Sequence, residues 1–215
     1  MRSVWVIVVA AGSGSRFGRP KQYEELGGRR VIDWSVAAAR ATAAGPEDGV
    51  VVVVRPDRAG EPEPDATVVV AGGATRSSSV RAGLAVVPGH ADVIVVHDGA
   101  RPLAGAELFA RVVEAVREGA DAAVPAVEVT DSLRHRSGGR VDRGGLVAVQ
   151  TPQAFPAAAL RRAHAAEPEA TDDASLVEAM GGKVVIVEGY PANLKITRSI
   201  DLAIAEALLR FGETR

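Results

Sequence analysis

The sequence predicts an α/β fold in which helices cover a mostly parallel, doubly wound sheet. Short valine-rich runs without polar alternation recur along the chain, as expected of strands buried on both faces. Stretches with helical periodicity separate these runs. The two loops richest in functional residue types, 10–21 and 97–102, both follow such strands. In sheets of this class, ligands bind at the carboxyl ends of the strands.

Strands and helices alternate through the first 127 residues. The predicted strands are short apolar runs at 4–10, 50–54, 67–70, 92–96 and 122–127. The predicted helices lie at 31–44, 75–86 and 105–118, and Gly45-Pro46 ends the first of them. The polar, proline-rich stretch 55–65 predicts a surface loop. This repeated strand–helix order is typical of a parallel sheet.

The segment 128–149 interrupts this alternation. Valine–polar alternation surrounds a Gly138-Gly139 turn, which predicts two extended arms. Because an isolated hairpin is only marginally stable, we expect this β-arm to pack on something else, such as a second subunit. The fold then closes with predicted elements at 147–150, 156–166, 172–180, 184–187, 193–196 and 198–210, of which the first, fourth and fifth are strands. We expect one domain over 1–215, with the β-arm as an insertion.

Length and composition narrow the function. The 215 residues can bury a large core, and the net charge of −2 with scattered basic residues argues against nucleic acid as the main partner. No apolar run approaches the roughly 20 residues of a membrane span, and we expect no signal peptide. The absence of cysteine excludes disulfides and thiolate metal sites. We therefore expect a cytoplasmic protein that binds neither membrane nor nucleic acid.

The loop 10–21, AAGSGSRFGRPK, predicts a phosphate site. Its glycines let backbone N–H groups approach phosphate oxygens, and its cations, Arg16 and Lys21 among them, neutralise charge. It is not a Walker A loop, because Gly18 precedes Arg19 and not Lys-Ser or Lys-Thr. It is not a dinucleotide fingerprint, because Phe17 stands where the third glycine would be. Its pattern, A-A-G-x-G-x-R followed by P-K, resembles the signature loop of nucleotidyltransferases that join a sugar or polyol phosphate to a nucleotide.

Four further motifs make the resemblance more specific. They are GGATRSSSV at 72–80, HDGARP at 97–102, VDR at 141–143 with TPQ at 151–153, and TDDAS at 171–175 with NLKIT at 193–197. With the opening loop, they resemble the 2-C-methyl-D-erythritol 4-phosphate cytidylyltransferases of the non-mevalonate isoprenoid route, in the family's order and over nearly the whole chain. Val9, Gly99 and Ser132 depart from residues frequent in that family. None of these departures removes a charged group from the expected site.

The resemblance implies a Rossmann-like nucleotidyltransferase fold, a β-arm that swaps across a homodimer, and Mg²⁺ as cofactor. The implied substrates are CTP and methylerythritol phosphate, and the products are CDP-methylerythritol and pyrophosphate. One alternative is a different polyol phosphate acceptor, such as ribitol 5-phosphate. A second alternative, a non-catalytic or NAD-binding Rossmann module, is disfavoured by the missing third glycine.

Nucleotidyl transfer brings two anions together, so we expect cations and positioning to carry the catalysis. Arg16 and Lys21 are expected to hold the triphosphate; the alternative is that they are solvated loop cations. The resemblance gives Lys195 an α-phosphate contact, and strand alternation would place it opposite Leu194 and Ile196. The alternative for Lys195 is an edge-strand lysine.

Asp98 ends a buried strand, which suits a carboxylate that binds Mg²⁺ directly or through water, although an Asp-Gly pair alone usually marks a turn. We expect His97 to be structural and Arg101 to orient the loop or Asp98. CTP is assigned to small residues and backbone groups at Ala10, Ala11, Gly12, Gly14, Gly73 and Ser79, beside Asp98. One serine of 77–79 is alternatively a helix cap.

The polyol phosphate is expected to contact Arg143, Thr151 and Thr171, with Ser132 as a further candidate. Arg143 lies on the β-arm, so we expect it to reach the site of a neighbouring subunit. Thr171 could equally be the N-cap of a helix, with acidic residues in the first turn.

Overall fold

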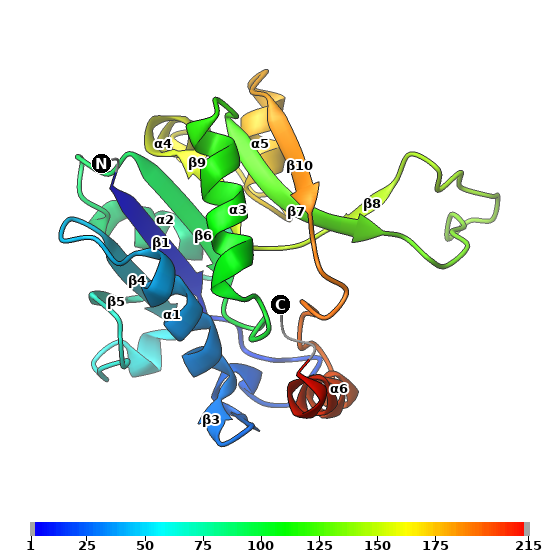
Figure 1. The fold of residues 1–215 in the computed structure, drawn as a ribbon, viewed down its shortest axis with the longest axis horizontal. Helices are drawn as coiled ribbons and strands as arrows, with labels where there is room; N and C mark the ends of the chain where they lie inside the picture. Colours follow the sequence, from blue (N-terminus) through cyan, green and yellow to red (C-terminus); the bar gives the residue numbers. More distant parts are fainter. Residues whose placement is uncertain (1–2, 213–215) are drawn as a thin grey trace.

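A computed structural model describes residues 3–212, and its centre is one eight-stranded sheet (Figure 1). The strands are β1 (Val4–Val9), β4 (Gly49–Val54), β5 (Val68–Ala71), β6 (Val93–Asp98), β7 (Ala122–Glu128), β8 (Val147–Val149), β9 (Gln153–Pro156) and β10 (Val184–Glu188). Their order is β10-β7-β9-β6-β1-β4-β5, and β8 pairs with β7. A two-stranded ribbon, β2 (Glu25–Leu26) with β3 (Arg29–Arg30), follows the opening loop.

The mostly parallel α/β sheet confirms the predicted fold class. β1 runs parallel to β4 and β6, and Val9 is the register partner of Asp98. The loops after β1 and β6 therefore leave the sheet side by side. The prediction missed β9, which is inserted antiparallel between β6 and β7. Gln153 and Pro156 give this four-residue strand no continuous apolar run, so it carries no recognisable strand pattern.

Helices cover both faces of the sheet. α1 (Val31–Thr42) and α3 (Ala106–Arg117) pack on one face, where Phe109 contacts the core that holds Val6 and Val8. α2 (Arg76–Val86), α4 (Ala157–His164) and α5 (Ala174–Ala179) cover the other face, with Leu160 in the cluster of Trp5 and Ile7. The two β1 faces thus bury alternate residues in different layers. Each fully buried aliphatic side chain contributes about 1.5–3 kcal/mol.

The C-terminal helix α6 (Ser199–Phe211) packs below the carboxyl end of the sheet in a third apolar cluster with Leu26 and Ile196 (Figure 1). Asp201 begins it by accepting hydrogen bonds from the backbone N–H groups of Thr197 and Arg198, both at 2.8 Å. Two short 3₁₀ helices, at Lys21–Tyr23 and Pro56–Arg58, lie in the loops. No helix in residues 3–212 is both long enough and apolar enough to cross a bilayer.

Two predicted strands differ from the structure. The segment 193–196 is irregular: Arg101 donates to the carbonyl of Asn193 at 2.7 Å, and Ile196 N donates to Ala100 O at 2.8 Å. The β-arm projects from the body (Figure 1). Beyond β8, the described residues of the arm form only one isolated antiparallel bridge, between Arg134 and Arg140. The arm is therefore a mostly irregular excursion and not a regular hairpin.

Candidate active site

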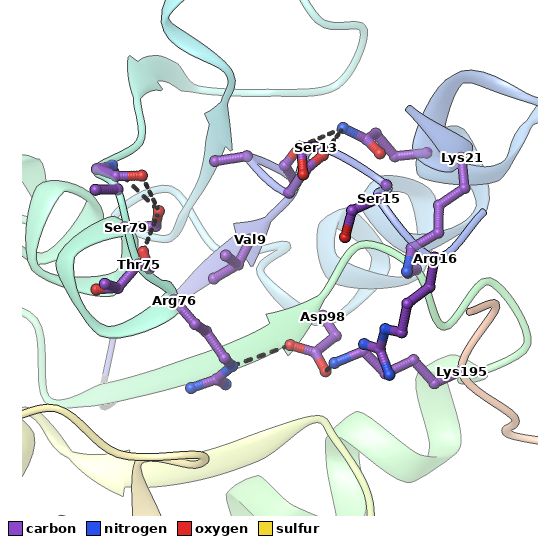
Figure 2. Close-up of a pocket in the computed structure, with 18 residues that line it drawn as sticks. Val9, Ser13, Ser15, Arg16, Lys21, Thr75, Arg76, Ser79, Asp98 and Lys195 are labelled. Carbon is purple, nitrogen blue, oxygen red and sulfur yellow. Dashed lines mark hydrogen bonds and ion pairs between the residues drawn. The ribbon is translucent and has the colours of Figure 1, made fainter. Parts of the chain in front are cut away.

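A cleft of about 400 Å³ opens at the carboxyl ends of β1 and β6 (Figure 2). The opening loop, the start of α2 and the 193–197 segment bound it. Ten residues predicted to bind nucleotide or to act in catalysis line this cleft: Ala10, Ala11, Gly12, Gly14, Arg16, Lys21, Gly73, Ser79, Asp98 and Lys195. The structure therefore brings together residues that are up to 185 positions apart in the sequence (10 to 195).

The opening loop is fixed by its own backbone and by Gln22, for which the sequence analysis proposed no role. The buried amide of Gln22 donates to Ala10 O at 2.8 Å and to Gly12 O at 3.0 Å. Gly14 has a φ of 71°, and a Cβ at this position would lie 1.9 Å from the carbonyl oxygen of Arg19. Only glycine fits this turn, and residues 10–16 of the loop line the cleft.

A wall of small residues forms the opposite edge of the cleft. A Cβ on Gly72 would lie 2.3 Å from Ala11 Cβ and 2.8 Å from Ser79 Oγ. The hydroxyl of Ser79 donates to Thr75 O at 2.8 Å and accepts from Gly73 N at 3.2 Å. The N-cap of α2 is Thr75 and none of the three serines, so that alternative is wrong in its residue; Ser78 takes part as the N3 partner in the capping box of Thr75.

Asp98 is buried and held by two cations. Lys195 Nζ lies 2.6 Å from Oδ2, and Arg76 Nε lies 3.2 Å from Oδ1. Burial alone would raise the pKa of Asp98, but Arg76 and Lys195 hold it well below its ordinary range. The carboxylate is therefore ionised at every physiological pH. Lys195 projects away from Leu194 and Ile196, which pack in the third apolar cluster, as predicted, although no strand orients it.

Arg76 also lines the cleft, although no role was predicted for it from the sequence. A signal for it existed: Arg76 is the first residue of α2, where the helix dipole disfavours a cation. An arginine at that position indicates that its charge is needed by something other than the helix. The groups that need this charge are its two carboxylate partners, Asp98 and Asp173.

Three cations converge on one side of Asp98. Figure 2 shows Arg16, Lys21 and Lys195 reaching into the same space. Half-burial lowers the pKa of the Lys21 ammonium, and repulsion from Lys195 and Arg16 lowers it further. Clustered, partly desolvated cations are unfavourable without an anion, so the geometry is suited to a polyphosphate.

The donor set fits Mg²⁺ bound together with a phosphate ligand. Within residues 3–212, Asp98 is the one carboxylate that lines the cleft, and no group of three or more His, Cys, Asp or Glu side chains forms a metal site. Mg²⁺ commonly binds through one or two carboxylates, with phosphate oxygens and water completing its shell. A single carboxylate facing a phosphate site is such an arrangement.

A family model described as 2-C-methyl-D-erythritol 4-phosphate cytidylyltransferase matches residues 4–211. The chain belongs to this family. It is 44% identical over 221 residues to the 2-C-methyl-D-erythritol 4-phosphate cytidylyltransferase of Rhodococcus jostii, covering 97% of this chain and 96% of that protein. This match confirms the resemblance and the nucleotidyltransferase class.

Two further comparisons agree. A solved 2-C-methyl-D-erythritol 4-phosphate cytidylyltransferase from Thermus thermophilus has a TM-score of 0.82 at 40% identity, covering 98% of this chain and all of that one. The bifunctional enzyme IspD/IspF of Clavibacter michiganensis is 44% identical over 224 residues, covering 95% of this chain. The chain spans only 54% of that relative's length.

The residues matched to the family's acceptor motifs do not line the cleft of their own chain. Thr151 is buried, and its hydroxyl accepts from Asp98 N at 3.0 Å and lies 3.1 Å from His97 Nδ1. It supports Asp98 from behind. Thr171 is exposed on the segment before α5, and the N-cap of that helix is Asp173. The interpretation of Thr171 as the N-cap is therefore wrong, and its acceptor contact stays a prediction.

Arg143 and Ser132 lie on the β-arm of this family member. They share a hollow of about 150 Å³ with Leu133, Arg134, Arg140 and Val141. Arg143 also donates to the carbonyl oxygen of Val129 at 3.0 Å. Neither residue lines the cleft, so their acceptor contacts stay predictions.

His97 has the structural position that we expected, whereas the Arg101 side chain is bonded to a different segment than expected. Burial lowers the pKa of His97 to about 4, so the imidazole is neutral near pH 7. Its Nε2 lies 3.2 Å from Arg101 O. The Arg101 guanidinium holds the 193–197 segment through the carbonyl of Asn193, and thus fixes the backbone that carries Lys195.

Proposed function

We propose that this chain transfers the cytidylyl group of CTP to 2-C-methyl-D-erythritol 4-phosphate, forming CDP-methylerythritol and pyrophosphate for isoprenoid precursor synthesis. One observation carries the proposal: Arg16, Lys21 and Lys195 converge beside ionised Asp98 in the cleft at the carboxyl ends of β1 and β6. Family membership over residues 4–211 supports the choice of substrates.

The reaction needs charge stabilisation more than a base. A phosphate oxygen of the acceptor attacks the α-phosphorus of CTP, and pyrophosphate leaves in line. Because the nucleophile is already an anion, no general base is required. Arg16 and Lys21 hold the triphosphate and stabilise the charge on the pentacovalent phosphorus and the leaving group. Preorganised donors of this kind are each worth about 10²–10³-fold in kcat.

Without substrate, the ammonium group of Lys195 is held in an ion pair and is not free in solvent. Its ammonium lies 2.6 Å from Asp98 Oδ2. A triphosphate offers a second anion, so Lys195 moves to the α-phosphate and releases Oδ2. Arg76 remains on Oδ1 and keeps the carboxylate in place. Asp98 would then hold Mg²⁺ directly or through water, and the ion when bound neutralises phosphate charge.

The small wall of the cleft gives selectivity for cytosine. Ala10, Ala11 and Gly12 on one side and Gly73 and Ser79 on the other leave backbone groups and one hydroxyl to read the base. A purine is larger than a pyrimidine and would be excluded by size. We expect CTP to be used in preference to ATP and GTP.

We further propose a cytoplasmic homodimer in which the β-arm of one chain completes the site of the other. Three observations support it: the arm projects from the body, Leu146, Val147 and Val149 are exposed on it, and Arg143 does not line its own cleft. An arm that binds only its own chain would leave these apolar side chains in water. A closed two-fold dimer covers both copies of such a surface equally.

Mixing two impaired variants, assayed at an acceptor concentration well below the KM of Arg143→Ala, tests the arm exchange. A Lys21→Met chain has a defective cleft, and an Arg143→Ala chain has a defective arm. In a mixed dimer, the intact cleft receives the intact arm, so an equal mixture should recover about a quarter of wild-type activity per chain. Native mass spectrometry can show that mixed dimers have formed. If they have formed and activity is not recovered, the result contradicts an arm that acts in trans.

The acceptor assay tests the function itself. The chain is incubated with CTP, Mg²⁺ and either methylerythritol phosphate or ribitol 5-phosphate, and pyrophosphate release is measured. We expect release with methylerythritol phosphate, and loss of it when the metal is chelated. Faster release with ribitol 5-phosphate would reassign the acceptor. No release with either acceptor, together with binding of NAD, would overturn the proposal.

A further inference from the structure

The segment 168–173, which joins α4 to α5, is tied along the first two turns of α2. We name this segment the strap. Ala170 N donates to Ser77 Oγ at 3.1 Å, and that hydroxyl lies 3.3 Å from Ala170 O. Arg81 donates to Pro168 O at 2.9 Å. The strap therefore follows α2 closely, although α2 and the strap are about 90 residues apart in the sequence.

The strongest tie is made by Arg76. Its Nη1 lies 2.8 Å from Asp173 Oδ2, while its Nε lies 3.2 Å from Asp98 Oδ1. One guanidinium thus joins the strap to the carboxylate of the cleft. The planar fork of arginine can serve two carboxylates in this way, whereas the ammonium of lysine is a single point charge.

Asp173 is held from its other side as well. It is 1% exposed, and its Oδ1 lies 3.0 Å from His164 Nε2 at the end of α4. The row Asp98–Arg76–Asp173–His164 therefore runs from the cleft into the core between α2 and α4. Buried ion pairs add little net stability compared with apolar packing of the same volume, so stability alone does not account for this row.

The strap carries Thr171, and the start of α2 carries the nucleotide side of the cleft. Gly73 and Ser79 flank Arg76 in the sequence, and both line the cleft with it. Any shift of the strap relative to α2 would move Thr171 relative to the nucleotide. A displacement of about 1 Å between reacting groups can cost roughly 10²-fold in rate.

We propose that Arg76 is a positioning residue that fixes the strap, and Thr171 with it, relative to Asp98 and the nucleotide-binding edge of α2. This inference rests on the proposed function, because it takes Thr171 as an acceptor contact. Arg76 sets the register between the two substrates and does not itself react.

Asp173→Asn tests the link with little change in shape. It removes the charge that holds Arg76 to the strap and leaves Asp98 and the opening loop intact. At saturating CTP, we expect the KM for the acceptor to rise roughly 10- to 100-fold. The Kd for CTP, measured by calorimetry without acceptor, should change less than about twofold, because Asp173 does not line the cleft.

Arg76→Lys separates geometry from charge. It keeps the cation but cannot hold Asp98 and Asp173 from two nitrogens of one plane. We expect it to raise the acceptor KM as Asp173→Asn does. If Arg76→Lys kept the wild-type acceptor KM, charge alone would suffice and the proposed positioning by the planar guanidinium would be overturned.

Asp92→Asn is the matched control. Asp92 lies at the amino end of β6, opposite Asp98, and its carboxylate accepts from Ser3 N at 2.9 Å. The substitution removes a comparable carboxylate contact outside the strap. It should lower thermal stability about as much as Asp173→Asn does, and it should leave the acceptor KM at the wild-type value.

Amide hydrogen exchange supplies a readout that needs no catalysis. Exchange of the amides of 169–173, above all that of Ala170, which donates to Ser77 Oγ, should be faster in Asp173→Asn than in wild type and Asp92→Asn, because the strap opens more often. Unchanged exchange, or an unchanged acceptor KM in folded Asp173→Asn, would overturn the inference. An inactive wild type would instead overturn the proposed function, and the exchange experiment would still decide whether Arg76 anchors the strap.

Discussion

Lys21→Met separates the catalytic use of the cations from their effect on the fold. The methionine keeps most of the side-chain volume and removes the charge. Burial and repulsion from Lys195 and Arg16 lower the pKa of Lys21, so its charged form is disfavoured in the folded protein. We expect the free energy of unfolding to stay equal or to rise by up to about 1 kcal/mol. We expect kcat to fall about 10²–10³-fold, equivalent to about 2.7–4 kcal/mol of transition-state stabilisation.

Pyrophosphate release gives kcat, and urea unfolding gives stability. Lys183→Met is the matched control, because Lys183 is an exposed lysine at the start of β10, outside the cleft. The difference in unfolding free energy between Lys21→Met and wild type should vanish above about pH 10.5, where Lys21 loses its proton in the unfolded chain as well. Loss of more than about 1 kcal/mol of stability, or near-normal kcat, would refute the reasoning.

Three further predictions address the arm, the base pocket and acid stability. Arg143→Ala should raise the KM for the acceptor more than that for CTP, unlike Arg136→Ala at the arm tip; a loss confined to CTP would mean that the arm is misassigned. Gly72→Ala would place a Cβ 2.3 Å from a neighbouring methyl group and should weaken CTP binding by about 1–3 kcal/mol in calorimetry, whereas Gly60→Ala, with open space around it, should not. His97 is buried with its pKa lowered to about 4, so its neutral form is favoured in the fold. In urea titrations, the free energy of unfolding should therefore be at its full value above about pH 6.5 and should fall by up to about 3 kcal/mol towards pH 4. A free energy that does not change over this range would contradict the burial of His97 as a neutral group.

Local sequence patterns predicted most of the sheet and the loop cations that line the cleft. Valine runs such as that of β4 bury all their residues, so their strand state follows from hydrophobicity alone. Arg16 and Lys21 lie in one short loop, and the positive φ of Gly14 follows from the need for a tight turn. These features depend on neighbours within about ten residues.

The features that the sequence analysis missed depend on tertiary contacts. β9 is a strand because β6 and β7 lie on both sides of it, not because Gln153 or Pro156 favours one. The 193–196 segment is held by Arg101 and Ala100 and needs no strand partner. No sequence pattern reveals such partners.

Arg76 and Thr151 show the same limit inside the site. Arg76 stands in a motif that the sequence analysis quoted, but its pairing with Asp98 and Asp173 appears only when α2, β6 and the strap are in place. The hydroxyl of Thr151 turns towards Asp98 N and not into the cleft. A motif identifies which residues matter, and the fold decides which of them touch substrate.

The identity of the product tests the central claim most directly. Phosphorus NMR of the chain with CTP, Mg²⁺ and methylerythritol phosphate follows both products in one sample. The account predicts that pyrophosphate and CDP-methylerythritol appear in equal amounts, and that Lys21→Met slows both alike. Pyrophosphate without the cytidylylated acceptor, or no turnover by folded wild-type protein, would contradict it.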